Sequence, residues 1–351
     1  MSDFDVMAER EWVAPFAVDV RRTLSVQGRG RGDPTFQADE AGAVWRTSLT
    51  PDGPATIRVL PGRPPEQPAD AAVEQAAENA SAPVTPVRAR AWGPGAQWLL
   101  DALPGALGLY DDISGFDPDA HPVIRDAARR NPGLRLGRSG RLMEALVPAV
   151  LEQKVVVLEA HRAWRILLAK YGTPPPGPAP RGMRVFPPPG TWRRIPSWEW
   201  HRAGVEGVRA ETIIRAASVA DSLERLLTLT HEEADRKLRT IPGIGVWTSA
   251  EARQRAAGDP DAVSVGDYHL KNVVGWALAG KDRATDEEML ALLEPFKGHR
   301  HRATRLIGLS RGNGTAGAAR PSGSGTGIAR YGSGGPPRRG PRMSVRDYRS
   351  F

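Results

Sequence analysis

The sequence predicts a small α+β domain, then a mostly α-helical domain, and finally a disordered basic tail. The N-terminal part of the 351-residue chain contains β-branched, alternating runs between turn signals. From about Gly95, apolar residues recur three and four positions apart, which is typical of helices with one buried face. The residues from Gly308 onward are rich in Gly, Ser and Arg and have almost nothing to bury. We place the three parts at residues 1–105, 106–307 and 308–351.

The first part is expected to contain strands separated by turns, together with one surface helix. The sequence "PDGP" at residues 51–54 predicts a turn, because Pro and Gly favour its backbone angles. The alanine-rich run 68–80 predicts a surface helix. The predicted strands lie within residues 16–28, 41–50, 55–62 and 82–92.

The second part is expected to consist of helices and one long loop. Asp119, Thr230 and either Thr285 or Asp286 are expected N-caps, because short polar side chains accept hydrogen bonds from unpaired N–H groups. The proline-rich stretch 172–190 predicts an extended loop, since proline does not continue a helix. The helical segments are expected within residues 96–103, 121–131, 141–172, 209–227, 231–241, 247–258 and 285–296.

Net charge gives little evidence of a nucleic-acid-binding face on the folded part. The chain has 48 basic and 40 acidic residues and a net charge of +8. Eight arginines and one acidic residue lie between Gly308 and Phe351, so this stretch carries +7 and the rest of the chain only +1. The high isoelectric point, about 10.1, therefore describes the tail.

Composition excludes several classes of site and of protein. The chain has no cysteine, which excludes disulfides, thiolate zinc sites and thiolate-ligated iron–sulfur clusters. No apolar run approaches the roughly 20 residues of a membrane-spanning helix, so we expect no membrane association. The acidic N-terminus "MSDFDVMAEREW" lacks the apolar core of a signal peptide, so we expect a cytoplasmic location.

The stretch "LRTIPGIGVWTSAEA" (238–252) predicts two helices joined by a tight turn, within residues 231–257. Pro242 breaks the first helix, and Gly243 and Gly245 can adopt backbone angles closed to other residues. The unpaired N–H groups of the next helix, together with its dipole, form a site for one phosphate. Helix, hairpin, helix is thus a grip on a DNA backbone; the alternative is a helix corner that binds nothing.

Together with "VSVGDYHLKN" (263–272), this stretch resembles the helix–hairpin–helix DNA glycosylases, above all their 3-methyladenine DNA glycosylase II (AlkA-like) branch. The resemblance covers roughly residues 35–307 and is strongest over 130–160 and 238–275. It implies an α+β N-terminal domain followed by a mostly helical glycosylase domain, whose two subdomains flank a cleft. It also implies a glycosylase activity on DNA.

Asp267 matches the catalytic aspartate of this family. Breaking an N-glycosidic bond builds positive charge on the sugar, which a carboxylate stabilises best where water is scarce. Alternatively, Asp267 caps the following helix, and both roles are compatible. Trp247 stands where members that also cut the strand carry a lysine, so the resemblance implies a monofunctional enzyme. Its ring would face a damaged base; the alternative is a Trp that packs the helix pair.

The resemblance assigns further roles to residues on both sides of the hairpin. Leu136 is expected to fill the gap left by a flipped base, with Arg138 as second candidate and core packing as the alternative. It implies an alkali-metal ion on the carbonyl oxygens of Arg239, Pro242 and Ile244, and no organic cofactor. The expected base pocket comprises Trp247, Glu251 and Gln153, and the expected DNA-backbone contacts are Gly243, Gly245, Val246, Thr248 and Lys271.

Two positions depart from the AlkA-like branch. Glu251 and Gly308 stand where the branch has aromatic residues, so the pocket is expected to be less aromatic and more acidic. Glu251 either attracts a cationic alkylated base, reads the donor edge of another lesion, or simply faces solvent on its helix.

The leading hypothesis is a monofunctional DNA glycosylase of base excision repair. It flips damaged, preferably alkylated, bases out of duplex DNA and hydrolyses their glycosidic bond, leaving an abasic site. We expect a nucleoid-associated monomer. The alternative is a protein that binds distorted or damaged DNA without excision. A third hypothesis gives the Arg/Gly-rich tail the main role, as a nucleic-acid or partner-binding arm.

Overall fold

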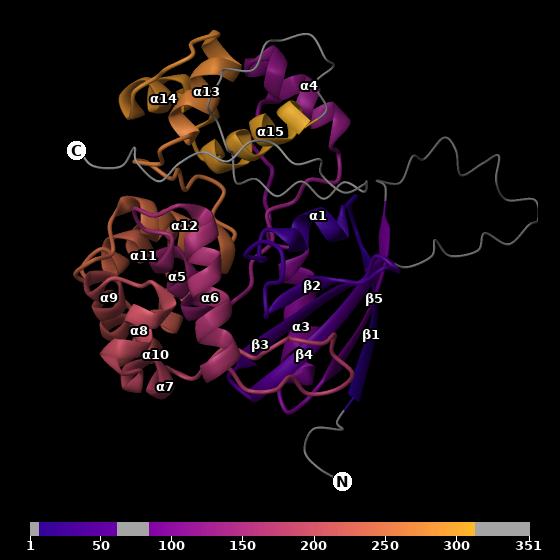
Figure 1. Ribbon diagram of the computed structural model, residues 1–351. Coiled ribbons are helices and arrows are strands. Elements are labelled where there is room, and N and C mark those ends of the chain that lie inside the picture. The colour runs from indigo at the N-terminus through magenta and orange to yellow at the C-terminus, as the bar shows by residue number, and fades with distance from the viewer. Residues whose placement is uncertain (1–6, 62–83, 313–351) are drawn as a thin grey trace, which may run out of the picture.

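The computed structural model describes residues 7–61 and 84–312, and shows an antiparallel sheet beside two groups of helices (Figure 1). The sheet has the strand order β1-β5-β4-β3-β2, and every neighbouring pair is antiparallel. Its strands are β1 (Met7–Ala14), β2 (Phe36–Ala38), β3 (Val44–Thr50), β4 (Gly53–Pro61) and β5 (Thr85–Trp92).

The sheet packs against α3 (Ala96–Ala106) around an apolar core. Strands β3 and β4 form a hairpin in which Thr50 pairs with Gly53, as the "PDGP" turn predicts. Gly53 has φ +123°, a conformation that favours glycine. Leu99, Leu100 and Leu103 of α3 are fully buried against the sheet. This α+β unit is the one expected at the N-terminus.

A first group of helices follows, with Trp164, Trp192 and Trp200 in its core. Helix α5 is anchored at its start by the Glu224 carboxylate, which accepts hydrogen bonds from the N–H groups of Leu142 (2.8 Å) and Met143 (3.1 Å). These helices are α5 (Leu142–Leu151), α6 (Val157–Tyr171), α7 (Pro189–Arg194), α8 (Ser197–Ala203), α9 (Gly207–Ser218), α10 (Ala220–Glu224), α11 (His231–Leu238) and α12 (Val246–Ala256).

A second group of helices joins an early segment of the chain to the last one. Its core contains Ile124, Met289 and Phe296. The helices are α4 (Pro122–Arg130), α13 (Leu270–Ala279), α14 (Asp286–Leu293) and α15 (Arg300–Gly312). Because α15 continues to Gly312, the first residues assigned to the tail are helical. The helical part thus has two cores, as the resemblance implies.

Three local expectations are wrong. Residues 16–28 contain a helix, α1 (Val20–Ser25), because the Asp19 carboxylate caps it by accepting from Arg22 N–H. Asp119 does not cap α4; the His121 ring does, immediately before the proline that starts the helix. Segment 141–172 is two helices, since α5 ends at Leu151 and α6 begins at Val157.

Other expectations agree with the structure or lie outside it. Thr230 and Thr285 each form a capping box, with Glu233 and Glu288 respectively. The proline-rich stretch 172–190 is mostly extended, and α7 begins only at its end. The helix expected at 68–80 and the tail beyond Gly312 lie outside the described residues.

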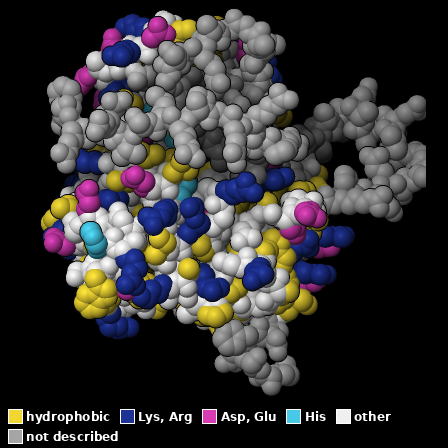
Figure 2. All heavy atoms as spheres, in the orientation of Figure 1, with side chains coloured by type: hydrophobic (Ala, Val, Ile, Leu, Met, Phe, Trp, Pro, Cys, Tyr) yellow, Lys and Arg dark blue, Asp and Glu magenta, His cyan; other side chains and the backbone are white. Residues whose placement is uncertain are grey.

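The described part of the chain contains no helix long and apolar enough to cross a membrane. On the face seen in Figure 2, Lys and Arg side chains are spread among acidic and apolar ones and are not gathered into one patch. This distribution agrees with the near-zero charge of the chain before the tail.

Candidate active site

The turn between α11 and α12 is shaped by Gly243. Its φ of +96° belongs to the region that favours glycine. A Cβ added there would lie 2.8 Å from Cγ2 of Thr212, which is fully buried on α9. Gly245, in contrast, has an ordinary extended φ of −94°, and a Cβ there would meet nothing within 4 Å. The expectation of a special backbone conformation therefore holds at Gly243 and is wrong at Gly245.

The first turn of α12 offers unpaired backbone donors. No side chain caps this helix at Gly245, and Val246 at its first position is 39% exposed. The first N–H groups of a helix have no partner within the helix, and here the space beside Gly245 is open. This is the arrangement that binds a phosphate oxygen.

Gln153 holds the turn from the end of α5. Its amide nitrogen donates to Gly243 O (2.9 Å) and to the Thr248 hydroxyl (2.8 Å). The structure thus gives Gln153 a role in positioning the hairpin. The Thr248 side chain is buried by this contact, which leaves its backbone N–H as the group that can face DNA.

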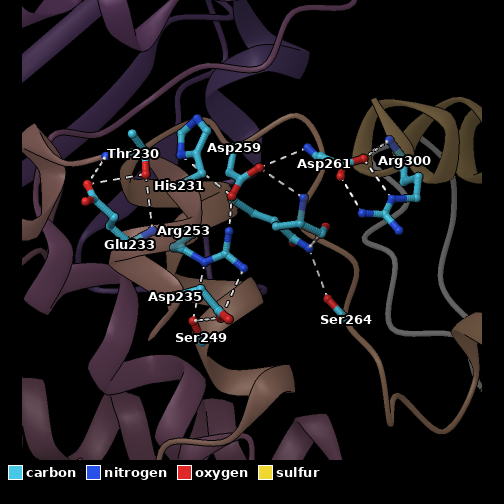
Figure 3. A network of polar contacts seen from close by, with 12 residues as sticks. Thr230, His231, Glu233, Asp235, Ser249, Arg253, Asp259, Asp261, Ser264 and Arg300 are labelled. Atoms are coloured by element: carbon cyan, nitrogen blue, oxygen red, sulfur yellow. Dashed lines mark hydrogen bonds and ion pairs between the residues drawn. The ribbon is translucent and has the colours of Figure 1, made fainter. Parts of the chain in front are cut away.

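A polar network joins the hairpin to the loop that carries Asp267 (Figure 3). Asp235 of α11 accepts from the Ser249 hydroxyl (2.7 Å) and from Arg253 (3.3 Å) on α12. Arg253 also forms an ion pair with Asp259, which is 1% exposed. Asp259 in turn accepts from the N–H groups of Asp261 (2.9 Å) and Ala262 (3.0 Å).

The network continues to the second helical group through an ion pair at the start of α15. Asp261 accepts from Arg300 Nε at 2.8 Å. The hydrogen bonds and the charge of Arg300 outweigh burial and keep the pKa of Asp261 below its usual value. Hairpin, loop and α15 are therefore fixed relative to one another.

Asp267 lies half-buried at the start of α13. Its Oδ1 accepts from the N–H groups of His269 and Leu270, both at 2.8 Å, so the side chain anchors the start of the helix from two residues before the N-cap residue, His269. Among the described residues, its Oδ2 accepts one hydrogen bond, from Trp247 Nε1 at 3.3 Å. One oxygen therefore fixes the carboxylate, and the other retains capacity to face a reacting group. Both expected roles of Asp267 are compatible with this geometry.

Trp247 and Glu251 lie one turn apart on the same face of α12, beside the Asp267 loop. Glu251 Oε2 accepts from Arg255 at 2.6 Å, and Oε1 accepts from the Ser264 hydroxyl at 2.5 Å. The Glu251 side chain is only 13% exposed. The expectation that it faces solvent is wrong.

A second buried ion pair lies next to Gln153. Arg29 donates to Glu152 at 3.1 Å, with side chains 4% and 14% exposed. Burial alone would raise the pKa of Glu152, but the charge of Arg29 and a hydrogen bond from His161 outweigh it and lower this pKa to about 2. The pair ties the N-terminal unit to the end of α5 beside the hairpin.

Leu136 is buried. It is 7% exposed, and its N–H donates to the Asp111 carboxylate at 2.9 Å. The core alternative therefore fits this residue. Arg138, the second candidate, is exposed and stacks over the Tyr110 ring at 3.7 Å. The Arg138 loop contacts the opposite end of α12, since Ser139 N–H donates to Arg255 O (2.9 Å).

Lys154 is a residue that the sequence analysis missed. It follows Gln153 in the turn between α5 and α6, is exposed, and has φ +53°. It is the one non-glycine residue with positive φ in the part of the chain that the structure describes. Such strain occurs preferentially at functional sites. The run of helix-type spacing through 141–172 gave no signal of this break.

Two further expectations concern ions. Lys271 forms an ion pair with Asp286 at 3.5 Å and is only partly exposed. Its positive charge is therefore already paired with a carboxylate in the absence of DNA. The carbonyl oxygens of Arg239, Pro242 and Ile244 accept none of the turn and loop hydrogen bonds formed among the described residues. Free carbonyl oxygens are suitable ligands for a hard cation, so these three fit the alkali-metal ion that the resemblance implies.

No protein-family model matches the chain. It is 32% identical over 174 residues to the probable bifunctional transcriptional activator/DNA repair enzyme AlkA of Mycobacterium tuberculosis, which covers 49% of this chain and 33% of that protein. It is 25% identical over 195 residues to the DNA-3-methyladenine glycosylase of Bacillus subtilis, which covers 54% and 64%. The chain thus spans between a third and two thirds of the length of these relatives.

Solved structures extend the likeness to most of the chain. The 3-methyladenine DNA-glycosylase from Archaeoglobus fulgidus has a TM-score of 0.62 at 16% identity, covering 87% of this chain and 99% of that one. This chain has the fold of the DNA glycosylases. An 8-oxoguanine glycosylase/lyase from Clostridium acetobutylicum has a TM-score of 0.61 at 13% identity, covering 88% and 99%. The resemblance to helix–hairpin–helix glycosylases is confirmed, while enzymes of this fold are named for different damaged bases.

Proposed function

We propose that the chain is a DNA glycosylase that hydrolyses the bond between a damaged base and its deoxyribose, without cutting the strand. The observation that carries this proposal is the hydrogen bond between Trp247, in the first turn of α12, and Asp267, next to backbone N–H groups that no side chain caps. The curated relatives are named for 3-methyladenine or for the DNA repair enzyme AlkA, so alkylated bases in duplex DNA are the first substrates to test.

In this proposal the Asp267 carboxylate stabilises the positive charge that builds on the sugar as the base leaves. Two backbone N–H groups hold Oδ1, so the carboxylate does not have to reorient during the reaction. The other oxygen, Oδ2, is the one available to the sugar or to the attacking water. Because the start of α13 already holds the Asp267 carboxylate in place, it can stabilise the charge on the sugar without first being ordered.

The hairpin supplies the grip on the DNA backbone. The N–H groups of Val246 and Thr248 are presented to a phosphate at the start of α12, and the lack of a side chain at Gly245 lets the phosphate approach closely. A cation on the hairpin carbonyl oxygens would add positive charge there. Lys271 is a further contact, provided that it exchanges Asp286 for a phosphate.

The absence of a lysine at position 247 supports hydrolysis without strand cleavage. A Schiff base with the sugar requires an amine at the reacting carbon. Trp247 cannot provide one, and its Nε1–H is directed at Asp267 instead. Water is therefore the proposed nucleophile, and an abasic site is the product.

Flipping a base also requires a side chain to occupy the gap in the duplex. Leu136 is buried, whereas Lys154 is exposed and follows the residue that holds the hairpin. We assign the gap-filling position to Lys154, whose long aliphatic stem can enter the stack while its ammonium group reaches a phosphate.

The test is a base-release assay on duplexes with single alkylated, deaminated or oxidised bases. Wild type is expected to release at least one of these bases and to leave the strand intact until alkali is added. The Asp267→Asn variant is expected to lose about 100-fold or more of this activity while still binding DNA. Asp282→Asn, at an exposed position near the end of α13, serves as matched control.

The binding-only alternative makes a different prediction in the same assay. It requires tight binding with no release from any duplex in the panel, and equal behaviour of wild type and Asp267→Asn. The names of the sequence relatives favour the enzyme over this alternative. Strand cleavage by wild type would instead contradict the hydrolytic mechanism.

A further inference from the structure

The turn between α5 and α6 carries Lys154 and is held through the residues that precede it. Arg209 of α9 donates to Leu151 O at 2.8 Å, and the Gln153 side chain donates to the hairpin. The Lys154 side chain itself has no hydrogen-bond or ion-pair partner in the part of the chain that the structure describes. A positive φ such as that of Lys154 persists only where the surrounding structure enforces it. The contacts made by the preceding residues therefore determine how this side chain is presented.

Glu152, which lies between these two contacts, is held by an arginine of the N-terminal unit. Nη1 of Arg29 donates to both oxygens of the Glu152 carboxylate, at 3.1 Å and 3.4 Å. The His161 ring of α6 lies 3.7 Å from the same carboxylate. Arg29 and Glu152 are 123 positions apart in the sequence, so the turn is held by a different unit of the fold from the one to which it belongs.

Arg29 is itself fixed within the 29–33 loop. Its backbone N–H donates to Asp33 Oδ2 at 2.6 Å, and its Nη2 donates to Ala145 O of α5 at 3.4 Å. Asp33 is fully buried, and its Oδ1 accepts from Trp164 Nε1 of α6 at 2.9 Å. The 29–33 loop thus contacts both helices that flank the turn, and it presents the Arg29 guanidinium in a fixed position.

A second ion pair joins the N-terminal unit to the other end of α5. Arg46 of β3 donates to Glu144 at 2.9 Å, with side chains 12% and 11% exposed. The Arg29–Glu152 pair is similarly buried. Glu144 lies in the first turn of α5, about 12 Å along the helix from Glu152 at 1.5 Å per residue, and therefore far from Lys154. The two pairs differ mainly in which end of α5 they hold.

We propose that Arg29 is a positioning residue for base flipping, because through Glu152 it holds the turn that presents Lys154 to the duplex. The proposal rests on the proposed function, in which Lys154 fills the gap left by the damaged base, and it adds the N-terminal unit to the residues that open the duplex. Filling the gap offsets part of the cost of unstacking the base. A turn released by loss of Arg29 would present Lys154 in many orientations and offset less of this cost.

The test compares release of one damaged base from two DNA substrates that differ in stacking. One is a fully paired duplex, and in the other the same base lies in a short mismatched bubble, where it is already partly unstacked. The base is the one that wild type releases fastest. Arg29→Met is expected to slow release from the duplex by roughly tenfold or more relative to the bubble, because the paired base carries the larger cost of unstacking. Equal slowing on both substrates would overturn the proposal.

Arg46→Met is the matched control, because it breaks the other ion pair between the N-terminal unit and α5. It is expected to destabilise the fold, as Arg29→Met does, and to leave the ratio of duplex release to bubble release unchanged. An equal fall of this ratio in both variants would mean that general destabilisation is responsible, and would contradict the proposal.

A double variant separates positioning from stability. Arg29→Met combined with Glu152→Met replaces the ion pair by two apolar side chains, which often restores the stability lost when one partner is removed. Methionine side chains are flexible and do not fix the orientation of the turn. The ratio of duplex release to bubble release should therefore stay low while urea unfolding recovers. Recovery of the ratio together with stability would show that Arg29 acts through stability alone.

The route from Arg29 to the DNA is tested by combining Arg29→Met with Lys154→Ala. Lys154→Ala alone is expected to lower the ratio at least as much as Arg29→Met, because it removes the side chain that fills the gap. Since Arg29 is proposed to act through Lys154, the double variant should behave like Lys154→Ala. A further fall of the ratio in the double variant would mean that Arg29 acts by another route.

A binding experiment separates failure of this proposal from failure of the proposed function. Asp267→Asn, combined with either Arg29→Met or Arg46→Met, is titrated with a duplex that holds a tetrahydrofuran abasic site beside 2-aminopurine. The fluorescence of 2-aminopurine reports its stacking, so it changes without turnover when a side chain enters the gap. A smaller change at saturation with Arg29→Met than with Arg46→Met supports the proposal even if no base is released from any duplex. Equal changes, or none with either protein, overturn it even if base release by wild type is fast.

Discussion

The hairpin and the far end of α12, around Arg255, are built in different ways. The hairpin is held largely by residues close in sequence, such as Asp235, Ser249 and Arg253 (Figure 3). The far end is joined to the N-terminal unit, since Arg255 donates to Val26 O and its own carbonyl accepts from Gln27. The network around the hairpin therefore joins neighbouring parts of the sequence, whereas the far end of α12 depends on contacts with the N-terminal unit.

The largest expected effect tests the network that supports the hairpin. Arg253→Met leaves the Asp259 carboxylate, 1% exposed, without its cation. Breaking a buried ion pair in this way costs about 3–5 kcal/mol of unfolding free energy. Urea unfolding should show this loss, while Arg215→Met, in an exposed pair with Glu211, should cost under about 1 kcal/mol. Equal losses in the two variants would show that the network does not stabilise the hairpin.

The second prediction concerns the Arg29–Glu152 pair beside the hairpin. Since the pKa of Glu152 is lowered to about 2, its contribution is complete above its ordinary pKa of 4.5 and is lost as pH falls toward 2. Glu152→Gln should therefore lose roughly 3 kcal/mol of unfolding free energy at pH 7.

The control for Glu152 is pH itself. The difference between wild type and Glu152→Gln should shrink steadily when urea midpoints are measured from pH 6 down to pH 3. A difference that is independent of pH over this range would mean that ionisation of Glu152 does not stabilise the fold.

The third prediction compares the two hairpin glycines. Gly243→Ala places a Cβ against the buried Thr212 side chain at a positive φ, and should cost roughly 2 kcal/mol of unfolding free energy and weaken DNA binding. Gly245→Ala meets no atom and has an ordinary φ, so thermal unfolding should be unchanged. DNA affinity should fall in both, because the added methyl group at Gly245 occupies the approach of the phosphate. Destabilisation by Gly245→Ala would contradict this division.

The smallest expected effect concerns Lys154. Lys154→Gly relieves a positive φ of 53° and should stabilise the fold by about 1 kcal/mol or less. The same change should slow base release, because the side chain proposed to fill the gap is lost. Lys154→Asn is the control for strain, because asparagine also tolerates a positive φ. Increased stability with unchanged release would remove Lys154 from the proposed mechanism.

The sequence predicted those features whose causes lie within a few residues. The capping boxes at Thr230 and Thr285, the β3–β4 turn and the break at Pro242 all follow from neighbouring side chains. Asp267 could be placed at a helix start for the same reason. The strand expected at 16–28 failed because the Asp19 cap outweighs the alternation of valines around it.

Features that depend on distant contacts could not be predicted. Gln153 was expected in the base pocket, but its hydrogen bonds to Gly243 and Thr248 cross about ninety residues of chain. Glu251 pairs with Arg255 four residues later on the same helix, which local spacing indicates, but its hydrogen bond with Ser264 across the loop follows from no local pattern. Leu136 was expected to fill the gap left by a flipped base, with core packing as the alternative, and its burial depends on packing that the local sequence does not specify.

The anchoring of the start of α13 by Asp267 affects how such sites can be compared between proteins. Its Oδ1 accepts hydrogen bonds from the first turn of α13. A related protein that no longer excises bases would therefore still be under selection to keep this aspartate for stability. The tryptophan across from it makes no such structural demand through its single long hydrogen bond of 3.3 Å. A related protein that retains this aspartate but lacks the tryptophan would therefore be expected to have lost its glycosylase activity.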